Sequence, residues 1–159
     1  MKRREFLVGS VIAIGLLGSG KLLAGDAFEV TKTKDEWKKI LTPEQFHILR
    51  EEGTEAPFTS KLVDEHREGT FHCVGCDYPL FESNTKFDSG TGWPSFYFAI
   101  ERHIATKQDN SMFMKRTEYH CARCGGHHGH VFDDGPKPTG LRYCSNGAVL
   151  TFKPSSKQA

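Results

Sequence analysis

The hydrophobic and polar positions follow three successive patterns along the chain. An apolar run from Phe6 to Gly18 comes first, directly after a basic start. From residue 31 apolar residues recur at the spacing of helices, and after Gly69 they fall in short runs separated by Gly, Pro, Ser and Asn. Short runs of this kind are typical of β-strands. We therefore expect a separate leader, a short helical segment and a mainly β body.

Two short helices are predicted ahead of the β-rich part. Thr33 followed three residues later by Glu36 is the pattern of a capping box, and so is Thr42 followed by Gln45. Gly53 is placed to end the second helix, because glycine readily adopts the left-handed conformation at a helix end.

Short strands are predicted over most of the remaining chain. Phe71 lies in the first such run, and Phe96 and Phe98 lie in a later one. The stretch 112–119 is predicted to be a strand, and so is the stretch 148–152, where apolar residues alternate with polar ones. Twelve Phe residues indicate an aromatic-rich core.

Residues 1–27 have the features of an export signal. A basic start precedes the apolar run, and small residues follow it. The run is shorter than the roughly 20 residues that a membrane span needs. The pair Arg3-Arg4 resembles a twin-arginine signal, with cleavage after Ala24 or Ala27. We expect residues 28–159 to form one domain that is exported to the periplasm. The alternative is that the leader stays uncleaved and anchors the domain to the membrane.

The charge balance excludes a general electrostatic affinity for nucleic acid. The whole chain has a formal net charge of +1, and without residues 1–27 it has 17 Lys and Arg against 18 Asp and Glu. Nucleic-acid-binding domains instead carry a clear basic excess. No coiled-coil pattern is visible, so we expect a monomer.

Four of the five cysteines form two Cys-x-x-Cys pairs, which are 44 residues apart: Cys73 with Cys76, and Cys121 with Cys124. Four thiolates match a closed tetrahedral zinc site, which leaves no open position for chemistry and is therefore structural. Two disulfides are an alternative in an exported protein, and iron in the same cage is another.

Cys144 has no sulfur partner in this scheme. Arg142 and Asn146 lie two residues to either side, so in an extended strand all three side chains point to one face. A guanidinium favours the reactive thiolate. The alternative is an inert, buried thiol.

A second polar cluster contains His127, His128 and His130. His127 and His130 are candidates for proton donors beside a nucleophile, since imidazole titrates near neutrality. A second metal site is the alternative. Trp93 is fixed between Gly92 and Pro94, and its ring forms either core or the wall of an apolar pocket.

The chain resembles the methionine-R-sulfoxide reductase B family in four ordered motifs. These are LTPEQFHILREEGTEAPF, FHCVGCDYPLF, KFDSGTGWPSF and CARCGGHHGHVFDDGPKPTGLRYCSN, and the likeness extends over roughly residues 31–153. The resemblance implies two antiparallel sheets with short N-terminal helices and one structural zinc ion on the four cysteines. It also implies reduction of the R epimer of methionine sulfoxide, usually within oxidised proteins or peptides.

The resemblance assigns roles to individual residues. Cys144 becomes the nucleophile, which attacks the sulfoxide sulfur and ends as a sulfenic acid. His127 and His130 hold water and donate hydrogen bonds, and Asp134, Arg142 and Asn146 order that network. Trp93 receives the S-methyl group of the substrate, and Phe132 helps to close the pocket.

The chain departs from the family pattern at three places. Thr91 stands where many members have a resolving cysteine, so we expect repair of the sulfenic acid by an external thiol or a thioredoxin-like reductant. His128 replaces an aliphatic residue, and Gly147-Ala148 replaces a run that commonly contains Ser. The rival interpretations are a zinc-ribbon binding module without catalysis and a rubredoxin-like electron carrier.

Overall fold

The computed structural model describes residues 28–111 and 114–156. The predicted leader, residues 1–27, lies outside them, as do Met112 and Phe113. The helices are α1 (Lys34–Ile40) and α2 (Pro43–Glu51), and the 3-10 turns are η1 (Lys61–Asp64), η2 (Ser83–Thr85) and η4 (Gly147–Val149). The strands are β1 (Gly69–Cys73), β2 (Pro79–Glu82), β3 (Lys86–Phe87), β4 (Ser95–Phe96), β5 (Ile104–Asp109), β6 (Arg116–Cys121), β7 (His127–Phe132), β8 (Arg142–Ser145) and β9 (Leu150–Pro154).

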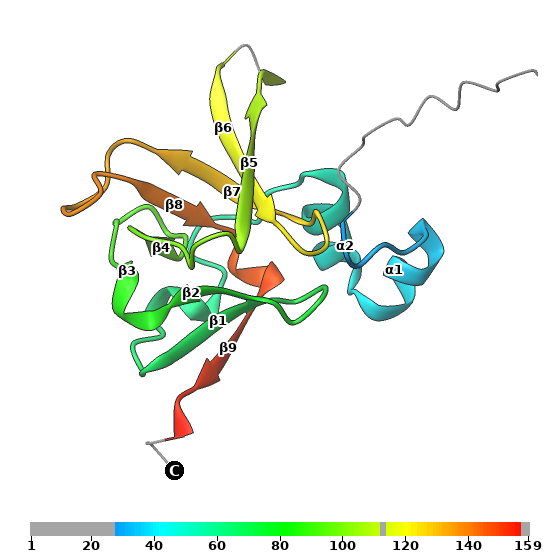
Figure 1. Ribbon diagram of the computed structural model, residues 1–159, viewed down its shortest axis with the longest axis horizontal. Coiled ribbons are helices and arrows are strands. Elements are labelled where there is room, and N and C mark those ends of the chain that lie inside the picture. The colour runs from blue at the N-terminus through cyan, green and yellow to red at the C-terminus, as the bar shows by residue number, and fades with distance from the viewer. Residues whose placement is uncertain (1–27, 112–113, 157–159) are drawn as a thin grey trace, which may run out of the picture.

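The strands form two sheets in which every neighbouring pair is antiparallel. The smaller sheet has the order β2-β1-β9, and the larger has the order β3-β4-β8-β7-β6-β5. Figure 1 shows the two sheets one above the other, with α1 and α2 together at one side of them. The prediction of a mainly β fold with two antiparallel sheets and short N-terminal helices is confirmed.

Both predicted capping boxes are present. Thr33 accepts a hydrogen bond from the backbone N–H of Glu36, whose carboxylate accepts one from the N–H of Thr33, and Thr42 and Gln45 repeat the arrangement. The end of α2 differs from the prediction. Glu52 rather than Gly53 takes the left-handed conformation, with φ of 58°.

Aromatic rings from both sheets meet in the core. The ring of Phe96 on β4 stacks on that of Phe81 on β2, with centroids 4.2 Å apart, and lies 4.9 Å from Phe71 on β1. Tyr119 on β6 packs edge-on against Phe81 at 5.9 Å. All four side chains are fully buried, so these contacts join the two sheets across a dry interface.

Three local predictions need correction. Ala148 lies in η4, and the regular alternation begins only with β9 at Leu150. Phe98 lies outside the strands and is half exposed. The described part of the stretch 112–119 becomes β6 only from Arg116. Within the residues described, no helix is both long and apolar enough to cross a bilayer.

Candidate active site and metal centre

The four paired cysteines converge on one point. The Sγ atoms of Cys73 and Cys124 lie 3.7 Å apart, those of Cys76 and Cys121 lie 3.6 Å apart, and all four lie within 4.8 Å of one another. A disulfide bond is only about 2.05 Å long, so these are free thiols. A tetrahedral zinc ion with Zn–S distances of about 2.3 Å spaces its sulfurs about 3.8 Å apart. The four sulfurs therefore fit a single tetrahedral metal ion, in place of the alternative of two disulfides.

Helix α2 packs against the two turns that carry the cysteines. A Cβ at Gly75, inside the first cysteine pair, would lie 2.7 Å from Leu49, and so would a Cβ at Gly126, directly after the second pair. Leu49 thus touches both halves of the cluster, and only glycine leaves it room. Arg50 donates a hydrogen bond of 3.0 Å to the carbonyl oxygen of Cys124. Helix α2 therefore packs directly on the backbone segments that carry the four cysteines.

Cys144 lies in the middle of the larger sheet, on β8. It is paired with Ser95 of β4 on one side and with His130 of β7 on the other. Its side chain is half-buried. A Cβ at Gly129 would lie 1.9 Å from the carbonyl oxygen of Cys144, so glycine is required for the close approach of β7 to β8. The strand that carries Cys144 is therefore hydrogen-bonded on both sides, to β4 and to β7.

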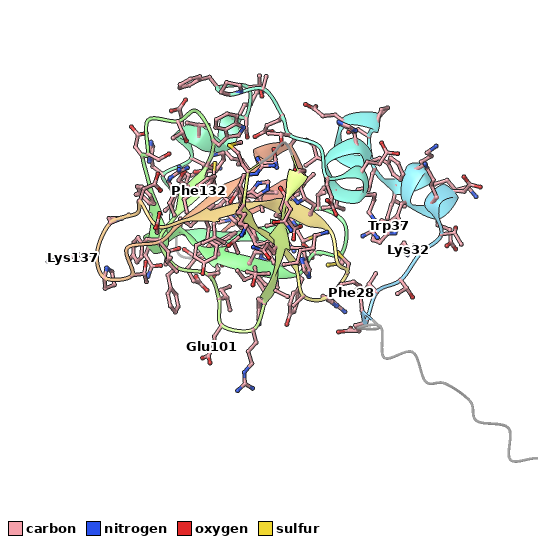
Figure 2. The ribbon with its side chains drawn as sticks, turned by 90° about the horizontal axis from the view of Figure 1, so that it is seen from above. Phe28, Lys32, Trp37, Glu101, Phe132 and Lys137 are labelled. Atoms are coloured by element: carbon pink, nitrogen blue, oxygen red, sulfur yellow. The ribbon has the colours of Figure 1, made fainter. Side chains whose placement is uncertain are left out.

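The guanidinium of Arg142 is held by two side chains, those of Asp134 and Phe132. Its Nε and Nη2 donate hydrogen bonds of 2.8 Å to the two carboxylate oxygens of Asp134. Its guanidinium carbon lies 4.4 Å from the centre of the Phe132 ring. Such a bidentate pair and ring contact restrict the guanidinium strongly. Figure 2 places Phe132 away from the end of the molecule where Phe28 and Trp37 lie.

The environment of Cys144 acts on its pKa in opposite directions. Burial raises the pKa of the thiol, whereas the Arg142 guanidinium and the Thr91 side chain lower it, and the net shift is upward. The expected assistance from Arg142 is present, but burial outweighs it. The raised pKa favours the protonated thiol near neutrality.

His127 and His130 lie on one face of β7 because of a β-bulge. Residues three apart on a regular strand point to opposite faces, but the register between β6 and β7 shifts at His120. The two imidazole centroids are consequently only 5.5 Å apart. His127 Nδ1 lies 2.8 Å from Glu118, and His130 Nε2 lies 2.8 Å from Asp109. Among the residues described, the four cysteines are the one group of three or more side chains placed to hold a metal ion, so the two imidazoles alone do not make a second metal site.

Trp93 and Asn146 are linked through a buried residue, Glu55. Trp93 Nε1 donates to the carbonyl oxygen of Glu55 at 3.2 Å, and the N–H of Glu55 donates to the side-chain oxygen of Asn146 at 3.0 Å. The amide nitrogen of Asn146 donates to the carbonyl oxygen of His128. The backbone of Asn146 is still extended, with φ of −71° and ψ of 110°, so its place on the face of Cys144 stays a prediction. Asn146 lies beyond the end of β8, and its amide braces two backbone segments.

Comparison with known proteins agrees with this arrangement. The SelR domain matches residues 41–154. The chain belongs to the SelR domain (MsrB) family. Three relatives carry the name "Peptide methionine sulfoxide reductase MsrB". The one from Pseudomonas putida strain W619 is 57% identical over 127 residues, which cover 79% of this chain and 96% of the relative. The one from Methanosarcina barkeri is 54% identical over 125 residues, which cover 78% and 88%. The one from Leptospira interrogans is 54% identical over 127 residues, which cover 79% and 97%.

Two of the residues that depart from the MsrB pattern have defined surroundings. Thr91 lies beside Cys144, and its hydroxyl is 2.8 Å from that of Ser89. His128 is fully buried and stacks on Tyr119 with centroids 6.3 Å apart. Neither ring nitrogen of His128 has a hydrogen-bond partner among the residues described. Burial lowers the pKa of His128 to about 3, so its ring is neutral.

Three polar residues of the site were missed by the sequence reasoning: Glu55, Asp109 and Glu118. Each is an acid that bonds a group far away in the sequence, so no local spacing identifies it. The sequence offered one signal, which is an acidic residue within a predicted strand. Because an unpaired charge is costly to bury, such a residue is expected to have a hydrogen-bonding partner. Glu118, only 2% exposed, is the clearest example.

Proposed function

We propose that the protein is a peptide-methionine (R)-S-oxide reductase that uses Cys144 as its nucleophile. The observation that carries this proposal is the position of Cys144. It lies opposite His130 in a polar site, with Arg142 close enough to act on its pKa, and it lies apart from the cluster of the other four sulfurs. Membership of the MsrB family supports the reaction type.

The reaction transfers the sulfoxide oxygen to the cysteine. The Cys144 sulfur attacks the sulfoxide sulfur and forms an S–S bond. The oxygen then moves to the Cys144 sulfur as its bond to the methionine sulfur and the S–S bond break, which leaves a sulfenic acid on Cys144 and releases the thioether of methionine. The cysteine sulfur loses the two electrons that the sulfoxide sulfur gains, so no other oxidant or reductant enters this step. The thiol proton is retained as the proton of the sulfenic acid.

The neighbouring side chains divide the remaining tasks. His127 and His130 handle protons and water at the sulfoxide oxygen, and the guanidinium of Arg142, held by Asp134, stabilises the thiolate as it forms. Trp93 and Phe132 supply apolar surface for the S-methyl group, a sulfur–aromatic contact worth about 0.3–1.5 kcal/mol.

An external thiol completes the cycle. Two thiol groups of a reductant, for instance a thioredoxin-like protein, reduce the sulfenic acid to the thiol with release of water and form one disulfide. The basis of this proposal is Thr91, which stands beside Cys144 without a sulfur atom. The metal on the four cysteines is proposed to be zinc in a structural role, because a closed four-sulfur cage has no position for substrate.

The reaction is tested with separate R and S sulfoxide epimers of a blocked methionine and dithiothreitol as the reductant. We expect turnover of the R epimer alone, and its loss in Cys144→Ser. A folded, zinc-loaded wild type that reduces neither epimer would contradict the proposal and favour a binding module of the zinc-ribbon kind.

We also propose that residues 1–27 direct export of the folded, metal-loaded protein to the periplasm. The support is the basic start with Arg3-Arg4, the short apolar run and the small residues after it. Fractionation of cells that express the full chain tests this. A processed protein in the periplasmic fraction is expected, retention in the membrane fraction would indicate an uncleaved anchor, and a cytoplasmic protein would contradict export.

A further inference from the structure

Glu118 is an acid in the interior of the larger sheet. It lies on β6, directly opposite His130 of β7, and its side chain is 2% exposed. Burying a carboxylate is costly unless several hydrogen-bond donors compensate for the lost water. The mechanism above gives Glu118 no task, so its partners need an explanation.

The two partners of Glu118 are both imidazoles. Oε1 lies 2.8 Å from Nδ1 of His127, and Oε2 lies 3.0 Å from Nδ1 of His120. Although burial opposes ionisation, the hydrogen bonds from His120 and His127 lower the pKa of Glu118 to about 2. An ionised carboxylate only accepts hydrogen bonds. Both imidazoles must therefore carry a hydrogen on Nδ1.

This bond determines which nitrogen His127 presents to the site. The ring is 3% exposed, and its Nε2 is a buried atom without a partner among the residues described. Because Nδ1 is bonded to Glu118, Nε2 is the ring nitrogen that remains free for another partner. An unpaired buried nitrogen is costly in the absence of a ligand or water, so its presence indicates a position meant for one.

His130 is held in the opposite way. Its Nε2 donates to Asp109, which leaves Nδ1 as the free nitrogen. Hydrogen bonds from Ser111 and His130 keep the pKa of Asp109 below its usual range, so Asp109 is also an acceptor. The two histidines of the site thus present different nitrogens, and in each case a carboxylate makes the choice.

We propose that Glu118 is a positioning residue, which fixes the tautomer and orientation of His127 so that Nε2 faces the sulfoxide oxygen or the water bound to it. His120 holds Glu118 from the opposite side and keeps the carboxylate in place. The inference rests on the proposed reductase function, because it assigns His127 a role in that reaction.

The direct test is ¹⁵N NMR of histidine-labelled wild-type protein, which reports the tautomer of each imidazole. We expect neutral His127 to carry its hydrogen on Nδ1. A hydrogen on Nε2 alone would overturn the proposal. This measurement needs neither substrate nor activity, so it separates a failure of this inference from a failure of the proposed function.

The kinetic test uses Glu118→Gln, whose amide can donate to Nδ1 and so allows the other tautomer. We expect kcat for the R epimer to fall about 10- to 100-fold, with KM nearly unchanged and the Nδ1–H signal of His127 reduced. The matched control is Glu101→Gln, the same change at an exposed acid in the turn before β5, which should leave kcat unchanged. An unchanged kcat in a folded Glu118→Gln, or an equal loss in both variants, would overturn the proposal.

Discussion

The protein has two sulfur sites on one small fold, and they differ in almost every respect. Four cysteines meet in a cluster covered by α2, whereas Cys144 is alone on a central strand among charged and imidazole side chains. The cluster fits a metal ion and leaves no free position, while Cys144 is half-buried and lies apart from the other sulfurs. The surroundings of each thiol, and not its identity, separate the cysteines that fit a metal ion from the one proposed to react.

The largest effect is expected from replacing one cysteine by serine in each site. Cys121→Ser removes a metal ligand and should unfold the domain, because structural zinc contributes about 10 kcal/mol or more to folding. Cys144→Ser should retain the zinc and the fold but lose at least about 10³-fold in turnover. Zinc content, circular dichroism and turnover measure the difference. A folded and active Cys121→Ser would show that the cluster is dispensable.

Removal of the charge beside Cys144 should have the next largest effect. Arg142→Met eliminates a guanidinium that lowers the pKa of the thiol. We expect kcat/KM to fall about 10- to 100-fold at pH 7. Because the thiol pKa rises in the variant, activity should recover in part as the pH increases. The control Arg67→Met removes an exposed guanidinium paired with Glu65 and should leave the profile unchanged. A uniform loss at every pH would instead indicate a defect in substrate binding.

Thr91→Cys should convert the single-thiol site into a two-thiol site. Thr91 lies beside Cys144, so after one turnover the introduced thiol should form a disulfide with Cys144 while zinc stays bound. Mass spectrometry of the oxidised peptides measures this, with Thr91→Ser as the matched control. Persistence of the sulfenic acid in Thr91→Cys would mean that the two positions do not come within bonding distance.

The smallest effect is expected from His128, a buried ring that stacks on Tyr119. Its two ring nitrogens are buried without a partner among the residues described, and its pKa is lowered to about 3. His128→Leu should therefore increase the free energy of unfolding by about 1–3 kcal/mol. Since the unfolded chain binds the proton with the ordinary histidine pKa, wild-type stability falls as the pH drops from about 6.5 towards 3, and the advantage of the variant should grow over that range. Urea denaturation at pH 7 and pH 5 measures it, and a destabilised variant would contradict the account.

The features that were predictable from the sequence are those with local causes. Thr33 and Thr42 each begin a helix through a contact only three residues away, and the Cys-x-x-Cys spacing already brings two sulfurs together. Arg142 was expected beside Cys144 because strand geometry places residues two apart on one face. The resemblance to the MsrB family supplied the roles of the histidines.

The features that could not be predicted depend on pairings between distant strands. The bulge that brings His127 and His130 to one face exists only in the register of β6 and β7. Glu118 is a local neighbour of His120 but meets His127 only across that pairing. The bond between Asn146 and Glu55 could not be predicted for a related reason, because the two residues lie 91 positions apart in the sequence.

The most direct test of the central claim is a single turnover without reductant. Zinc-loaded wild type is mixed with excess R sulfoxide, released methionine is counted, and the cysteine peptides are weighed after a sulfenic-acid trap is added. The account predicts one methionine per chain, one trapped sulfenic acid at Cys144 and full retention of zinc. Loss of zinc together with a disulfide between Cys144 and a cysteine of the cluster would contradict the separation of the two sulfur sites.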